Sequence, residues 1–290
     1  MHQISFTDSI SQLKSLWIQT FLLIMNNAFS NTYYQRFSGI ARLYGEQALI
    51  NFQQSKIAVI GIGGVGSWVA ESLARSGIGH ITLIDMDDVC ITNTNRQIHA
   101  LKQNIGQTKT DVMAERILQI NPECHVSCID DFINQTNTCE YLGTRDQPKY
   151  DFIIDAIDSV RDKAAVLAHC RRNKLKIITI GGAGGQKDPT KIQVSDLAKT
   201  VQDPLVAKLR ERLKGEFKLT KDSKGKYGIA CVYSTEQLTY PTTNGQVCLV
   251  KNQAEGPKKM DCSSGFGAIT TVTATFGFVA VSYVLDRLSK

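Results

Sequence analysis

The sequence predicts an α/β fold: a Rossmann-like, mainly parallel sheet with helices on both faces and an elaborated C-terminal half. Between residues 56 and 180, short apolar runs alternate with amphipathic stretches, a pattern typical of strand–helix–strand units. A glycine-rich turn separates the first apolar run from the stretch that follows it. Hydrophobic residues make up 42% of the 290 residues and charged residues 21%, which excludes a disordered or fibrous chain.

Five apolar runs predict the strands of the sheet: residues 56–60, 80–85, 124–129, 151–156 and 176–180. Amphipathic stretches predict helices between them at 65–76, 108–120 and 160–173. The second of these helices opens at the capping-box pair Thr108 and Asp111 and stops before Asn121-Pro122. Parallel strands end at one edge of a sheet, and such sheets bind ligands beyond that edge.

The pattern after residue 181 is less regular. We expect a basic helix at 203–213, a charged loop at 214–226 and short strands and turns at 227–264. Residues 265–285 carry no charge and are long enough to cross a bilayer. Their Gly, Thr and Ala content favours a buried helix, with membrane contact as the alternative.

The chain divides into an N-terminal extension and one domain. Residues 1–30 are predicted to be a disordered extension or the product of a misassigned start, because Met25 is a second candidate start. Residues 31–290 are predicted to form a single domain, with a nucleotide-binding core at about 36–185 and an elaboration at about 186–290.

The net charge of +6 is concentrated in one segment. Residues 208–226 contain an excess of basic over acidic side chains, which favours a polyanionic partner, and a solvated helix and loop is the alternative. The candidate contacts are Lys208, Arg210, Arg212, Lys214, Lys218 and Lys221. The eight cysteines include no Cys-x-x-Cys pair, so we expect no zinc site and a reducing, cytoplasmic environment.

A phosphate-binding loop is predicted at residues 61–66, between the first strand and its helix. Gly61, Gly63 and Gly66 fit Gly-x-Gly-x-x-Gly, and Gly64 adds a fourth glycine. The glycines allow a tight turn and close approach of a phosphate, and the helix N-terminus supplies free N–H donors. Asp85 ends the next strand and is placed to hold a ribose. This loop alone is compatible with NAD as well as ATP.

Further polar residues at the strand ends favour ATP. A guanidinium suits phosphate recognition, and Lys109 beside a helix N-terminus needs a nearby anion. Asp155 ends the fourth strand, where a carboxylate can hold magnesium on the phosphates. We predict catalytic roles for Arg96, Lys109 and Asp155, and ATP contacts that also include Asp87, Asn93, Asn95, Gln97 and Asp158. Surface charges and helix caps are the structural alternative for each.

The motifs GIGGVGS, DMDDV, TNTNRQ and DAIDS resemble, in this order, the ubiquitin-activating-enzyme-like superfamily. The resemblance implies an adenylation domain in which Asp85 holds the ribose, Asn93, Arg96 and Lys109 the triphosphate, and Asp155 the magnesium ion. Members that adenylate small sulfur-carrier proteins usually have an Arg-Tyr-x-Arg-Gln segment and four zinc cysteines. This chain has Gly39 in place of the second arginine and no such cysteines. Carrier-protein adenylation is therefore the alternative function, beside a nicotinamide dehydrogenase and a nucleotide-binding scaffold.

Several sequence segments, most of them outside the nucleotide core, resemble those of the branch of this superfamily that dehydrates threonylcarbamoyladenosine in tRNA to its cyclic form. The similar segments are RFSGIARLYGEQAL, GGAGGQ, AEGPKKMDCSSGFGA and ATFGFVAVS. The resemblance implies an ATP- and magnesium-dependent homodimer that acts on tRNA, with a monovalent cation as a candidate ligand. Relatives are linked to cysteine-desulfurase systems, so Cys231 is a candidate sulfur acceptor from such a partner, and a buried inert thiol is the alternative.

Overall fold

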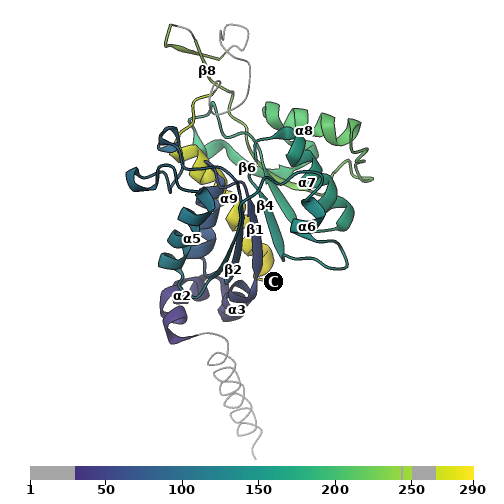
Figure 1. Ribbon diagram of the computed structural model, residues 1–290. Helices are drawn as coiled ribbons and strands as arrows, with labels where there is room; N and C mark the ends of the chain where they lie inside the picture. Colours follow the sequence, from purple (N-terminus) through teal and green to yellow (C-terminus); the bar gives the residue numbers. More distant parts are fainter. Residues whose placement is uncertain (1–29, 243, 250–265) are drawn as a thin grey trace, which may run out of the picture.

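A seven-stranded sheet forms the centre of the computed structural model, which describes residues 30–242, 244–249 and 266–290 (Figure 1). Its strands are β1 Lys56–Ile60, β2 His80–Ile84, β3 His125–Ile129, β4 Phe152–Asp155, β5 Ile177–Ile180, β6 Ile192–Asp196 and β7 Ala230–Ser234. They follow the order β3-β2-β1-β4-β5-β7-β6, and every pairing is parallel except that of β6 with β7. The predicted Rossmann-like α/β fold is confirmed. Residues 1–29 of the predicted N-terminal extension, and residues 254–265 of the segment AEGPKKMDCSSGFGA, lie outside the described residues.

Helices cover both faces of the sheet, and Figure 1 shows α5 on the opposite side from α7 and α8. One face carries α4 Gly66–Arg75, α5 Lys109–Ile120 and α9 Thr270–Leu288, and the other carries α6 Thr138–Leu142, α7 Val160–Asn173 and α8 Pro204–Gly215. α2 Asn31–Tyr44 and α3 Glu46–Gln54 precede the first strand. The remaining elements are η1 Ile91–Asn93, η2 Lys102–Asn104, η3 Pro189–Lys191, η4 Leu197–Lys199, β8 Tyr240–Pro241 and β9 Val247–Cys248.

The uncharged C-terminal segment forms α9, which packs closely on α4. A Cβ atom at Gly277 would lie 3.1 Å from both Val65 O and Val69 N, so the absence of a side chain lets the two helices approach. Val272, Phe276 and the apolar residues that follow them on this face join the larger core cluster. Over the described part of the chain, no helix combines the length and the hydropathy needed to cross a membrane.

The start of α5 differs from a capping box. Thr108 precedes the helix, but its side chain accepts no backbone hydrogen bond. Its Oγ1 donates instead to Asp111 Oδ2 over 2.6 Å. The N–H group of Lys109, the first residue of α5, donates to Asp87 O over 3.0 Å, at the carboxyl edge of the sheet where the predicted site residues lie.

Candidate active site

The glycine loop between β1 and α4 has a backbone that only glycine allows. Gly61 adopts φ +84°, and a Cβ atom at Gly66 would lie 1.7 Å from Gly61 O. The buried carboxylate of Asp85 fixes the turn from the end of β2, since Ile62 N donates to its Oδ2 over 2.5 Å. Gly66 thus serves helix–strand packing, while Gly61, Gly63 and Gly64 line the cavity beyond the loop.

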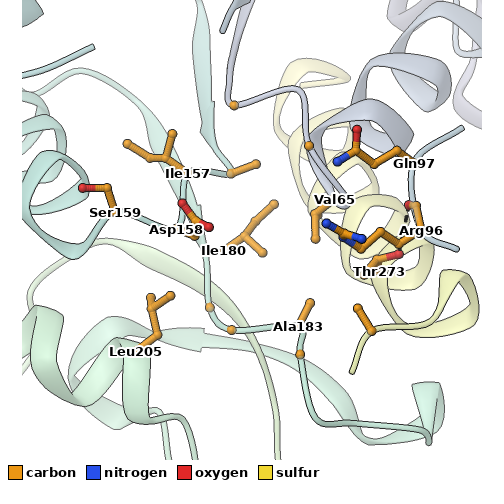
Figure 2. A pocket seen from close by; sticks show the side chains of 18 of the residues that line it. Val65, Arg96, Gln97, Ile157, Asp158, Ser159, Ile180, Ala183, Leu205 and Thr273 are labelled. Carbon is orange, nitrogen blue, oxygen red and sulfur yellow. Dashed lines mark hydrogen bonds between the residues drawn. The ribbon is translucent and has the colours of Figure 1, made fainter. Parts of the chain in front are cut away.

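That cavity has a volume of about 470 Å³ and opens at the carboxyl edge of the sheet (Figure 2). Its size is within the range of pockets for small molecules. Of the predicted ATP contacts, the residues that line it are Gly61, Gly63, Gly64, Asp85, Asp87, Asn93, Arg96, Gln97, Lys109 and Asp158. Gly66, Asn95 and Asp155 do not.

Arg96 is a buried cation in the cavity wall, with only 8% of its surface exposed. Its Nη1 donates to Thr92 O over 2.8 Å and to Asn95 Oδ1 over 2.9 Å. Asn95 in turn donates to Ala268 O over 2.7 Å, so Asn95 holds Arg96 rather than facing the ligand. Within the described ranges Arg96 forms no ion pair with a carboxylate. A buried charge without a counter-ion is costly, so this position favours an anionic ligand.

Lys109 has an anion beside it, as its place near a helix N-terminus requires. Its Nζ lies 2.6 Å from Asp87 Oδ2 and 4.0 Å from Asp85 Oδ1. Burial raises the pKa of the Asp85 carboxyl group, and Lys109 and two backbone N–H groups oppose that rise. The Asp87 side chain is 55% exposed, so Asp87 can leave Lys109 at little desolvation cost when a phosphate replaces it.

Asp155 and Asp158 occupy different environments although they are three residues apart. Asp155 is fully buried: its Oδ2 lies 2.9 Å from Lys163 Nζ and accepts from Thr179 Oγ1 over 2.6 Å. Ile157 N donates to its Oδ1 over 3.2 Å. Asp158 instead faces the cavity (Figure 2). The structure therefore places Asp155 beneath the site, away from the ligand contact expected of it. Of these two carboxylates, only that of Asp158 lines the cavity.

Comparison with known proteins gives the family. The model of the ThiF family matches residues 34–290. The chain belongs to the ThiF family. It is 63% identical to the tRNA threonylcarbamoyladenosine dehydratase of Escherichia coli K12, over 91% of this chain and 97% of that protein. The protein of the same name from Haemophilus influenzae is 53% identical over 90% of this chain and 95% of its own length.

A solved structure of the E. coli dehydratase in complex with ATP has the same fold as this ThiF-family chain. The TM-score is 0.78 at 58% identity, over 89% of this chain and 96% of that one. The phosphate loop and its cavity therefore belong to a fold that binds ATP in a similar protein.

The candidate sulfur acceptor of this ThiF-family chain is enclosed in the core. Cys231 lies in β7 with none of its surface exposed, and burial raises the pKa of its thiol. A neutral, enclosed thiol is a poor nucleophile. The position fits the inert alternative, and it does not offer Cys231 to a sulfur donor.

The six candidate tRNA contacts have unequal surroundings. Arg210 donates to Thr200 O over 3.0 Å and also bonds the Thr200 hydroxyl, so Arg210 ties α8 to the preceding segment. Arg212 pairs with Glu216 at 2.5 Å. The exposed lysines that remain are Lys208, Lys214, Lys218 and Lys221.

Part of the cavity wall was not among the predicted site residues. It comes from the segment after β5 and the start of α8, and it includes Gly182, Gln186, Asp203 and Leu205. The carboxyl end of β5 lies at the same sheet edge as those of β1 and β4. The strand pattern therefore could have predicted that the segment after β5 lines the cavity. α8 could not be placed there from sequence, because its position depends on packing against α7.

Proposed function

We propose that this protein uses ATP to dehydrate threonylcarbamoyladenosine in tRNA to its cyclic form. The close relatives that bear this name cover nearly the whole chain. The observation in the site that supports it best is Arg96, a buried cation without a carboxylate partner in the described residues, beside a glycine loop. The phosphates of a nucleoside triphosphate supply the negative charge that the buried guanidinium of Arg96 requires.

ATP is needed because a free carboxylate is a poor electrophile, whose leaving group would be oxide. Transfer of the adenylyl group from ATP to the threonyl carboxylate releases pyrophosphate and makes AMP the leaving group. A carbamoyl atom of the same side chain then closes the ring and expels AMP, so the oxygen lost as water leaves with AMP. Activation by phosphorylation follows the same logic with phosphate as the leaving group. The enzyme's main tasks are positioning and neutralising charge.

The residues divide these tasks by their chemistry. Backbone N–H groups at the start of α4 and the guanidinium of Arg96 would hold phosphate oxygens. When the nucleotide binds, the ammonium group of Lys109 would leave the carboxylate of Asp87 and pair with a phosphate of the nucleotide. Asp85 would hold the ribose, because its buried carboxylate keeps acceptor capacity beyond its two backbone contacts. Asn93 and Gln97 supply amide groups to the same wall.

The carboxylate set of the cavity fits magnesium that arrives with ATP. Mg²⁺ is usually held by one or two protein carboxylates together with substrate phosphates, and bound magnesium would neutralise charge on the phosphates. We propose Asp158 for this contact, with Asp155 acting through the loop between them. The expectation of a monovalent cation rests on the family resemblance alone.

The macromolecular partner is proposed to be tRNA, bound in part by Lys208, Lys214, Lys218 and Lys221. These exposed lysines supply positive charge on and after α8, whose first turn borders the cavity. A homodimer is expected from the resemblance, and sedimentation velocity of the purified protein tests it. A tRNA substrate also favours action in the cytoplasm. Cys231 is enclosed in the core, so a sulfur-acceptor contact does not enter the proposal. α9 packs one face into the core while Phe278 on the same helix stays 45% exposed, and a membrane contact does not enter the proposal.

Mass spectrometry of tRNA nucleosides tests the proposed reaction. Purified protein is incubated with ATP, magnesium and tRNA that carries threonylcarbamoyladenosine, and the cyclic nucleoside should form only when ATP is present. The matched control replaces ATP with a non-hydrolysable analogue. No cyclic product, together with pyrophosphate exchange that depends on a diglycine-tailed carrier protein, would instead support the adenylation of such a carrier.

A further inference from the structure

The wall of the cavity that follows β5 is built as a second binding surface, away from the phosphate loop. In Figure 2, Leu205 and Gln97 lie on opposite sides of the cavity, and Ala183 lies on its lower wall. Gly182 is held from two directions: its N–H donates to Asp203 Oδ2 over 2.9 Å, and its carbonyl accepts from Gln186 Nε2 over 3.1 Å.

Gln186 leaves one polar atom of this wall without a partner. The side chain is 3% exposed and lines the cavity, and its Oε1 is buried with no hydrogen bond from any described residue. The orientation of the amide is determined, because the Gly182 carbonyl can only accept and the nitrogen must face it. The free atom is therefore an acceptor, and a buried acceptor is stable only when a donor reaches it.

The backbone around Gln186 is rigid. Gly185 N donates to Gly267 O over 2.8 Å, and Gly185 O accepts from Thr239 N over 2.8 Å. Gly185 adopts φ +76°, and a Cβ atom there would lie 2.7 Å from the ring of Phe266. The acceptor is thus held in place before any ligand binds, which lowers the entropic cost of recognition.

The chemistry of the two substrates decides which donor fits. The phosphates of ATP only accept hydrogen bonds, and its ribose is assigned to Asp85 at the end of β2. The amino group of its adenine is a donor, but the adenine extends from the ribose away from the phosphate loop at β1, whereas Gln186 follows β5 on the other side of β1 in the sheet. The threonylcarbamoyl group carries an N–H donor on its carbamoyl nitrogen, next to the carboxylate that reacts. A neutral amide oxygen can accept from this N–H without the repulsion that a charged carboxylate would exert on the threonyl carboxylate. The carboxylate of Asp203 is already engaged by backbone N–H groups.

We propose that Gln186 recognises the threonylcarbamoyl group by accepting a hydrogen bond from its carbamoyl N–H through Oε1. This inference rests on the proposed function, and it names the side of the cavity that the modified base enters. Gln186 is thereby a specificity-determining residue for the tRNA substrate, and Gln97 on the other side remains a contact for the nucleotide.

The test compares Gln186→Met with two glutamine controls. Gln186→Met keeps the length of the side chain and removes the amide, whereas Gln193→Met makes the same change at an exposed position on β6 outside the cavity. For Gln186→Met we expect kcat/KM for modified tRNA to fall about ten-fold, as for one lost buried hydrogen bond, with the Kd for ATP within about two-fold of wild type. Gln97→Met should show the reverse pattern, and Gln193→Met should behave as wild type.

Binding measurements separate recognition of the base from support of the fold. The Kd is measured for tRNA carrying threonylcarbamoyladenosine and for the same tRNA without it, and Gln186→Met should lose the preference for the modified form. If the variant weakens ATP binding equally, or changes neither affinity, the inference is overturned. If its unfolding midpoint drops, both affinities are measured at a temperature well below that midpoint, where the variant is folded; it must still lose the tRNA preference while its Kd for ATP stays within about two-fold of wild type. Failure of the wild-type protein to form cyclic product would overturn the proposed function instead.

Discussion

The buried ion pair of Asp155 and Lys163 makes a quantitative prediction about stability. Both side chains are fully enclosed, and their charged atoms lie 2.9 Å apart. Lys163 Nζ also donates to Ile157 O over 2.8 Å, so the pair ties the first turn of α7 to the segment that leads to Asp158. Removing one partner leaves an uncompensated buried charge, and Lys163→Met or Asp155→Ala should each cost about 3–5 kcal/mol of unfolding free energy. Loss of activity in Asp155→Ala alone would therefore reflect loss of stability and would not show a catalytic role for Asp155.

A double-mutant cycle of Asp155→Asn and Lys163→Met, with both single variants measured by urea unfolding, checks this prediction. Asp155→Asn combined with Lys163→Met removes both charges, and it should be more stable than Lys163→Met alone by about 2–4 kcal/mol. The double variant should also need a higher magnesium concentration for half-maximal cyclisation, because the segment that positions Asp158 has lost its tie to α7. If Lys163→Met unfolds within about 1 kcal/mol of wild type, the pair does not hold this part of the site and the reasoning fails.

Four further predictions concern residues inside and outside the cavity. Lys109→Met should lower kcat about 100- to 1000-fold in the cyclisation assay while the protein stays folded, because a positioned cation for the reacting phosphates is removed; near-normal turnover would exclude that role. Lys218→Glu with Lys221→Glu should weaken tRNA binding and reduce the slope of log Kd against log salt by roughly 0.7–0.9 for each phosphate that the protein no longer neutralises, and an unchanged slope would move the tRNA surface elsewhere. Cys231→Ala should retain cyclisation, since the thiol is enclosed; a folded but inactive variant would show that the thiol takes part in the reaction despite its burial. Burial lowers the pKa of His99 from 6.5 to about 4, so its imidazole is neutral in both states above pH 6.5, and below that the unfolded chain takes up the proton first. The stability that this neutral group contributes is lost as pH falls from 6.5 toward 4, and the unfolding free energies of wild type and His99→Gln should converge over that range; a constant difference would contradict the lowered pKa.

The local elements of this fold follow from short-range patterns in the sequence. Buried parallel strands have to be nearly continuous apolar runs, and the helix predicted at 160–173 has those bounds in the structure. The phosphate loop is equally local, because the backbone at Gly61 and the close contact at Gly66 exclude other residues. By contrast, β6 was not predicted: it is a half-buried edge strand that exists through its antiparallel pairing with β7, more than thirty residues later in the chain.

The sequence by itself determined the α/β class, the family and the candidate nucleotide loop, since each depends on residue types at fixed short spacings. Only the tertiary structure decided which of the two neighbouring carboxylates, Asp155 or Asp158, lines the cavity. The sequence favoured Asp155 over Asp158 as the magnesium contact, but Lys163 of α7 pairs with the buried Asp155, and Asp158 is the one that lines the cavity. The role proposed for Gln186 also depends on the tertiary structure. Its Nε2 donates to Gly182 O, and this contact leaves Oε1 as an acceptor without a partner in the described residues. The roles of Asp155, Asp158 and Gln186 depend on which polar groups already have an ion-pair or hydrogen-bond partner. The packing of the folded chain, and not the local sequence pattern, sets those partners.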